Sequence, residues 1–124
     1  MKKLIFPLLF LLSSCQLINE DSRTYDLTEL EELYEKIVSI SESKVCTNPS
    51  QWKFTAIGNK ACGGPTSYIA YSSEINESEF LDLVAQYTKL QKEYNSKNNI
   101  GSDCSFVSPP SEIKCENGKA VFFY

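Results

Sequence analysis

The sequence of 124 residues contains no histidine, and it has only one methionine and one tryptophan. Without histidine, the side chain that enzymes most often use for proton transfer near neutral pH is missing. A cysteine or serine nucleophile would also lack its usual activating partner. Glycine-rich phosphate loops and nucleophile elbows are absent as well. We therefore expect a protein that is not an enzyme and that needs no cofactor.

Paired carboxylates leave an enzymatic alternative open, because two acids can support acid–base chemistry without histidine. The pair Glu77 and Glu79 is one example. These two acids lie in the first turn of a predicted helix, where negative charge stabilises the helix dipole. A structural role is thus the simpler interpretation.

Basic residues are outnumbered by acidic ones, with 12 Lys and Arg against 16 Asp and Glu. Without residues 1–14, which contain Lys2 and Lys3, the formal charge changes from −4 to about −6. Phosphate backbones are bound by clusters of Lys and Arg, and no such cluster is present. We expect no nucleic acid partner and no electrostatic attraction to an anionic bilayer.

Long apolar segments are missing except at the N-terminus. Lys2 and Lys3 form a positive start, and residues 4–12 are apolar apart from Pro7. A charged start followed by a short apolar run is typical of a secretory signal. The run of nine residues is far shorter than the ~20 residues that a membrane-spanning helix needs.

The residues Leu12-Ser13-Ser14-Cys15 resemble the lipobox of bacterial lipoproteins. In that family the cysteine thiol receives a diacylglycerol, the signal is removed before the cysteine, and the new amino group is usually acylated. The resemblance implies a signal peptide over 1–14, a lipidated tether over 15–24 and one domain over 25–124. Two or more acyl chains anchor a protein stably to a membrane. The alternatives are an ordinary cleaved signal with a chance cysteine, or a buried first helix.

The expected location is the cell envelope, with the protein anchored through Cys15 to the outer membrane and facing the periplasm or the surface. Glu20 and Asp21 follow the anchor closely and resemble the acidic surface-export signals of lipoproteins in Bacteroidota. A solvated linker is the alternative interpretation of these two acids.

Five cysteines would leave one thiol unpaired in an exported protein, but lipidation of Cys15 removes this problem. The remaining cysteines are an even set, and export permits disulfides. Of the three possible connectivities we favour Cys46–Cys62 with Cys104–Cys115, since both close short local loops.

A zinc site is the rival interpretation of the four cysteines. Structural zinc sites contain closely spaced ligand pairs, whereas these cysteines follow one another at intervals of 16, 42 and 11 residues. We therefore expect no metal site.

Hydrophobic periodicity predicts two helices and four strands in the order α-β-β-α-β-β. The first helix is expected from a capping box at Asp26 to about Ser43, and the second from Asn76 to about Asn95 or Ser96. Strands are expected over 51–57 and 67–72. A last hairpin over 113–124 turns at Asn117-Gly118, a dipeptide that suits a type I′ turn.

This order, without a βαβ crossover, predicts an α+β fold: a small disulfide-bridged domain with a four-stranded antiparallel sheet and two helices on one face. The apolar helix stripes together with Trp52 and Phe54 are expected to form the core.

The segment 51–72, with Cys62-Gly63-Gly64-Pro65, and the hairpin around Cys115 resemble small uncharacterised Cys-containing lipoproteins of Bacteroidota. The resemblance covers roughly residues 46–124. It supports the fold and implies no activity.

The loop over 58–66 holds three of the five glycines and is the candidate binding loop, with Lys60, Gly63, Gly64 and Pro65 as its candidate contacts. We expect a non-catalytic binding or inhibitory module with a protein partner, since a loop fixed by a bridge and a proline loses little entropy on docking. The glycines would otherwise serve only a tight connection.

The alternative function is a structural or envelope-assembly lipoprotein. Such a protein would contact another membrane protein or the cell wall through an aromatic face, either Tyr68 with Tyr71 or Phe122 with Tyr124.

Mass spectrometry of the processed polypeptide tests the anchor directly. The expected mass is that of a chain beginning at Cys15 with acyl groups attached, because the thiol and the new amino group are both acylated in this family. A chain with an unmodified Cys15 would contradict the lipoprotein interpretation.

Overall fold

The computed structural model describes residues 21–124, with side chains from Leu27 onward. The predicted signal, Cys15 and the tether up to residue 20 lie outside this part of the chain. The elements are α1 (Asp21–Ser41), the short 3-10 helix η1 (Pro49–Gln51), β1 (Trp52–Ile57), β2 (Ser67–Ser72), α2 (Glu77–Lys97), β3 (Glu112–Glu116) and β4 (Lys119–Phe123). The α+β class and the order α-β-β-α-β-β are confirmed.

Helix α2 begins as its sequence predicts. The Asn76 side chain accepts a hydrogen bond of 3.2 Å from the backbone N–H of Glu79, which satisfies one of the unpaired donors at the helix start. Ile75 packs against the cluster that contains the buried Phe80, in agreement with a hydrophobic staple. The helix ends at Lys97, one or two residues later than expected.

Helix α1 begins earlier than predicted. It starts at Asp21, so Asp26 is an interior residue and the predicted capping box at Asp26 is wrong. No glycine or proline lies between these two residues, and nothing in the sequence therefore stops the helix from extending back from Asp26. Its end at Ser41 falls two residues before the predicted Ser43.

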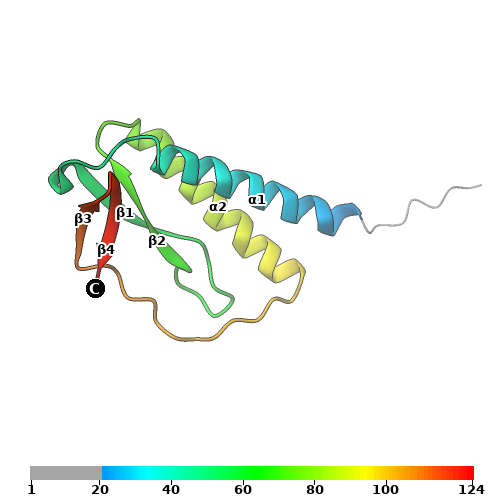
Figure 1. Ribbon diagram of the computed structural model, residues 1–124. Helices are drawn as coiled ribbons and strands as arrows, with labels where there is room; N and C mark the ends of the chain where they lie inside the picture. Colours follow the sequence, from blue (N-terminus) through cyan, green and yellow to red (C-terminus); the bar gives the residue numbers. More distant parts are fainter. Residues whose placement is uncertain (1–20) are drawn as a thin grey trace, which may run out of the picture.

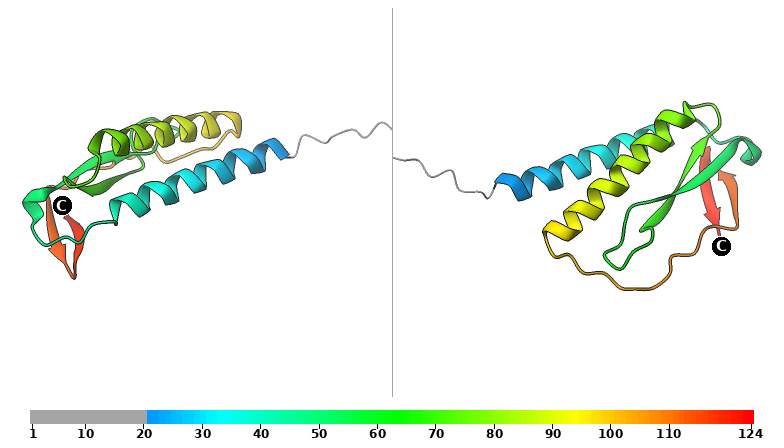
Figure 2. Two further views of the ribbon diagram at one scale, coloured as in Figure 1. Left: turned by 90° about the horizontal axis from the view of Figure 1, so that it is seen from above. Right: turned by 180° about the vertical axis from the view of Figure 1, so that it is seen from behind.

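The two helices lie side by side and run in opposite directions over one face of the β1–β2 hairpin (Figures 1 and 2). A buried cluster fills the space between them. It contains Leu30, Ile37, Ile57, Tyr71, Phe80, Leu83, Val84 and Tyr87. Ile57 and Tyr71 come from the strands and the other six from the helices, so this cluster joins both layers. No helix within residues 21–124 is both long enough and apolar enough to cross a membrane.

The four strands form two separate two-stranded sheets, whereas the sequence predicts one sheet of four strands. β1 pairs with β2 from Trp52 opposite Ser72 to Ile57 opposite Ser67, and β3 pairs with β4. The second hairpin contacts the first through side chains instead of a backbone ladder. The rings of Phe54 and Phe122, for example, meet edge to face at 5.9 Å.

The hairpin β3–β4 covers the face of β1–β2 that points away from the helices. A second buried cluster forms there from Cys46, Trp52 and Ala70, with side chains of β3 and β4 packed against it. The sequence predicts that Trp52 and Phe54 complete the core beneath the helices. This prediction is wrong, because both side chains face the second hairpin. This cover is incomplete, because Phe54 remains 36 % exposed.

The turn between β3 and β4 agrees with its sequence signal. Asn117 has φ 51° and Gly118 has φ 78°, the two positive values that a type I′ turn requires. The Gly118 carbonyl accepts a hydrogen bond of 2.8 Å from the N–H of Cys46, so the turn is held against the segment that follows α1.

The favoured disulfide pairing is wrong. The bridges are Cys46–Cys115 and Cys62–Cys104, with Cα atoms 5.3 and 5.4 Å apart. Cys46 precedes β1 and Cys62 follows it, so the length of a whole strand, roughly 20 Å, separates them. A disulfide requires Cα atoms within about 7 Å. A pairing that closes a short loop is also only slightly favoured over one that closes a long loop, because the entropy cost of loop closure grows only slowly with length.

Non-reducing peptide mapping is expected to recover peptides joined through Cys46–Cys115 and Cys62–Cys104. The double variant C46A/C115A is expected to lose about 2–4 kcal/mol of unfolding free energy, since this bridge closes a long loop and ties β3 to the rest of the domain. Urea denaturation measures the loss. A peptide joining Cys46 to Cys62 would contradict the pairing.

Candidate recognition loop

The recognition loop, residues 58–66, connects β1 to β2 and is held at its base by helix α2. The N–H of Gly58 donates to Thr88 Oγ1 at 3.0 Å, and the N–H of Asn59 donates to Gln91 Oε1 at 2.6 Å. Asn95 donates from its side chain to the Asn59 carbonyl at 2.8 Å. Residues three and four apart share a helix face, so one face of α2 supplies all three contacts.

The segment 98–111, which we call the strap, holds the loop from a second side. It runs from the end of α2 to β3 and passes beside the loop (Figure 1). The ammonium of Lys60 pairs with the carboxylate of Asp103 and donates to the Ser105 carbonyl at 2.9 Å. The disulfide Cys62–Cys104 adds a covalent link.

Hydrogen bonds inside the loop define its turn. The N–H of Lys60 donates to the Gly64 carbonyl at 2.9 Å, and the N–H of Gly63 donates back to the Lys60 carbonyl at 2.8 Å. Gly63 and Gly64 have φ of 97° and 82°, values that other residues rarely adopt. These two glycines are therefore required by the backbone conformation of the turn.

The tip of the loop, residues 61–64, is exposed. A Cβ atom built on Gly63 or Gly64 meets no heavy atom within 4 Å, so these residues border open space. Gly58 at the base is different, because a Cβ there would collide with the Thr66 side chain. The loop thus combines a packed base with an exposed tip.

The Lys60–Asp103 ion pair changes the pKa of Asp103 and fixes the position of the Lys60 charge. Hydrogen bonding to Lys60, and then to the side chain and backbone of Ser105, lowers the pKa of Asp103 from 3.8 to about 2. The Lys60 side chain is only 11 % exposed, whereas that of Asp103 is 74 % exposed. The ammonium is therefore turned inward onto the strap.

Of the predicted contact residues, the glycines and the lysine have different roles. Gly63 and Gly64 lie at the exposed tip, as a binding loop requires, and Pro65 is half-buried where the chain returns to β2. Lys60 is engaged by the strap, so its charge holds the loop and is not offered to a partner.

The sequence analysis did not identify the strap as a contact of the recognition loop. The residues Asp103-Cys104-Ser105 contain a signal that points to it, because an aspartate two residues before a serine often forms a local side-chain turn. Asp103 accepts from both the N–H and the hydroxyl of Ser105, at 3.1 and 2.6 Å.

Of the two predicted aromatic faces, the one with Tyr68 and Tyr71 does not form. Tyr71 is 4 % exposed because its ring packs under the helices, whereas Tyr68 lies on the opposite side of the same strand. Phe122 is half-buried beside Phe54, whereas Tyr124 is 79 % exposed.

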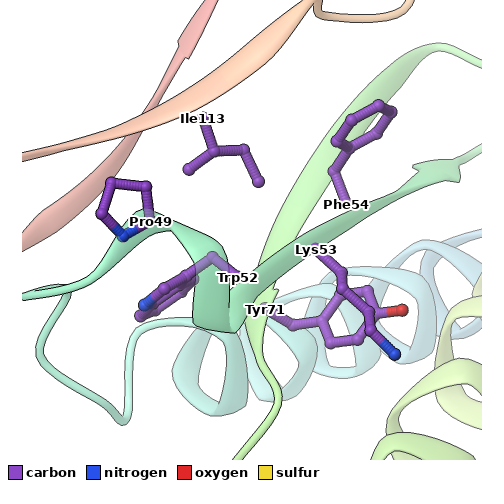
Figure 3. Close-up of a pocket in the computed structure, with 6 residues that line it drawn as sticks. All are labelled: Pro49, Trp52, Lys53, Phe54, Tyr71 and Ile113. Atoms are coloured by element: carbon purple, nitrogen blue, oxygen red, sulfur yellow. The ribbon is translucent and has the colours of Figure 1, made fainter.

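Glu77, a member of the candidate acidic pair, is tied to β1 and β2. It pairs with Lys53 at 2.9 Å and accepts from the Tyr71 hydroxyl at 3.1 Å. The hydrogen bond from Lys53, and then that from Tyr71, lowers the pKa of Glu77, while burial raises the pKa of Tyr71. Lys53 and Tyr71 border a shallow hollow of about 400 Å³ with no carboxylate in its lining (Figure 3).

Among the side chains that the structure describes, those of residues 27–124, no group of His, Cys, Asp and Glu is arranged to hold a metal ion. The chain matches no protein-family model, no curated protein and no solved structure.

Carboxyl-carbon NMR is expected to show Asp103 titrating with a midpoint near pH 2. Because the pKa is lower in the folded state, the ion pair stabilises the loop above about pH 3.8 and this contribution is lost as the pH falls toward 2. In K60Q the midpoint should rise toward 3.8. K89Q, which removes an exposed lysine of α2, is the control and should leave the Asp103 midpoint unchanged. An identical Asp103 titration in K60Q would contradict the assignment.

Proposed function

We propose that the protein is a membrane-anchored, non-catalytic binding or inhibitory module of the cell envelope, which presents the tip of its recognition loop to a protein partner. The observation that carries the proposal is the loop itself. Its tip is exposed and is joined to the strap by the Cys62–Cys104 bridge, while its base is fixed by α2 and by the Lys60–Asp103 pair.

A fixed tip favours binding because association penalises every group that must be ordered on contact. Three kinds of bond hold this loop before any partner arrives: hydrogen bonds to a helix, an ion pair and a disulfide. A loop that served only as a strand connection would need none of the contacts to the strap, since a tight turn closes with its own backbone hydrogen bonds.

The chemistry of the tip indicates what a partner would contact. Its residues are small, and within the described part of the chain the carbonyls of Ala61, Cys62 and Gly63 accept no hydrogen bond. Within the described residues, the N–H groups of Ala61 and Gly64 likewise donate no hydrogen bond. A tip without large side chains suits a narrow cleft lined by hydrogen-bonding groups, such as the substrate cleft of an enzyme.

The envelope location is supported by two separate features. Disulfides persist in oxidising compartments, and the domain contains two of them. The lipobox resemblance at Cys15 supplies the anchor, and the oxidised domain agrees with export through the predicted signal.

The proposal is tested by mixing the purified protein at micromolar concentration with a panel of serine proteases and lysozymes. Inhibition of one of them is expected. The variant A61R should weaken that inhibition at least ten-fold, because a long charged side chain at the tip blocks entry to a narrow cleft. A85R places the same substitution on the exposed face of α2 and is the matched control, which should inhibit like the unmodified protein.

If no enzyme of the panel responds, the inhibitory form of the proposal is removed. Pull-down from detergent-solubilised membranes then tests the binding form, with A61R and A85R compared again. A partner retained equally by both variants would contradict a role for the loop.

A further inference from the structure

A second candidate site lies between α1, β2 and β4, and none of its lining residues belongs to the recognition loop. It is a hollow of about 540 Å³, a volume within the range of small-molecule sites. Helix α1, strand β2 and strand β4 form three of its sides. Tyr34 and Val38 come from α1, Tyr68 and Ala70 from β2, and Ala120 and Phe122 from β4. We call it the aromatic hollow.

Trp52, the only tryptophan of the chain, also lines the aromatic hollow. It is 9 % exposed. Tyr34 is 41 % exposed on the α1 side. Several aromatic rings therefore meet around one partly open space, an arrangement that suits a planar apolar group.

Two lysines, Lys44 and Lys119, also line the aromatic hollow. Lys53, Lys60 and Lys114 each pair with a carboxylate, whereas Lys44 and Lys119 form no ion pair with the side chains described over 27–124. Glu42 is the single carboxylate of the lining, so the lining has an excess of positive charge. This excess stands out in an acidic protein of formal charge −4.

The backbone around the aromatic hollow is less suited to an extended peptide. Peptides that add to a sheet edge need its free carbonyl and N–H groups. The Ala70 carbonyl already accepts a hydrogen bond of 2.6 Å from the Ser41 hydroxyl, and the Gly118 carbonyl accepts from the N–H of Cys46. Some of the backbone hydrogen-bonding groups on the β2 side and on the β4 side are therefore already occupied.

We propose that the aromatic hollow binds a small aromatic monoanion. Its planar ring would lie against Trp52, and its carboxylate or sulfonate would bind between Lys44 and Lys119. The proposal does not depend on the recognition loop, because none of the residues 58–66 lines the hollow.

Fluorine NMR of the processed, lipidated protein in detergent micelles, labelled with fluorotryptophan, tests the proposal. Because the chain has one tryptophan, the spectrum contains a single resonance. Trp52 lines both the aromatic hollow and the shallow hollow of Figure 3, so the variants below assign any shift to one of them. Naphthoate is the probe, and naphthamide has the same ring system without the charge. Naphthoate is expected to shift the resonance saturably and to bind roughly five-fold more tightly than naphthamide, the effect of two exposed charge contacts.

Two variants assign the effect to the named residues. K44Q/K119Q should bind naphthoate and naphthamide equally, and K89Q/K92Q on α2 is the control with the same loss of charge, which should keep the preference for naphthoate. V38F fills the hollow from α1 and should abolish the shift with either compound.

The proposal is overturned if naphthoate leaves the resonance unchanged, or if naphthoate and naphthamide bind the unmodified protein equally. A shift that is the same in the unmodified protein and V38F would reflect partition into the micelle and would also reject the site. The A61R variant should behave like the unmodified protein, so failure here and failure of the recognition loop are distinguishable.

Discussion

The hairpin β1–β2 has only two strands, and a two-stranded hairpin is marginally stable in water unless other elements cover it. Alternating side chains of the strands point to opposite faces, so both faces need partners. Ile57 and Tyr71 face the helices, while Trp52 and Ala70 face β3–β4. The rest of the domain is arranged by this requirement, with helices on one side and the second hairpin on the other.

The same constraint places the disulfides. Covering the second face brings β3 close to the segment before β1, where Cys46 and Cys115 meet. The chain must then travel from the end of α2 back to β3, and the strap does so beside the turn of the first hairpin (Figure 1). Cys62 and Cys104 are joined along this path. Each bridge links segments far apart in sequence, which restricts the unfolded chain most strongly.

The recognition loop and the aromatic hollow arise from different parts of this arrangement. At the turn of the first hairpin, α2 and the strap fix a loop whose tip is exposed. Beside α1, β3–β4 covers the first hairpin only in part and leaves a space. A small domain buries a limited fraction of its surface, and here the uncovered parts are the candidate sites.

The sequence by itself determined the two helices, the four strands and their order along the chain. Local signals acted within a few residues: the Asn76 cap, the Asn117-Gly118 turn and the apolar stripe of α2 all formed as predicted. It also identified the glycines at the tip of the loop, because their conformational freedom is a local property.

Only the tertiary structure decided the pairing of the cysteines, the division of the strands into two sheets and the role of Lys60. Each depends on which distant segments meet, and short-range periodicity contains no such information. The sequence predicts that Lys60 contacts a partner, but Lys60 forms an ion pair with Asp103, 43 residues later. This ion pair follows from the path of the strap, which is set by the need to cover both faces of one hairpin.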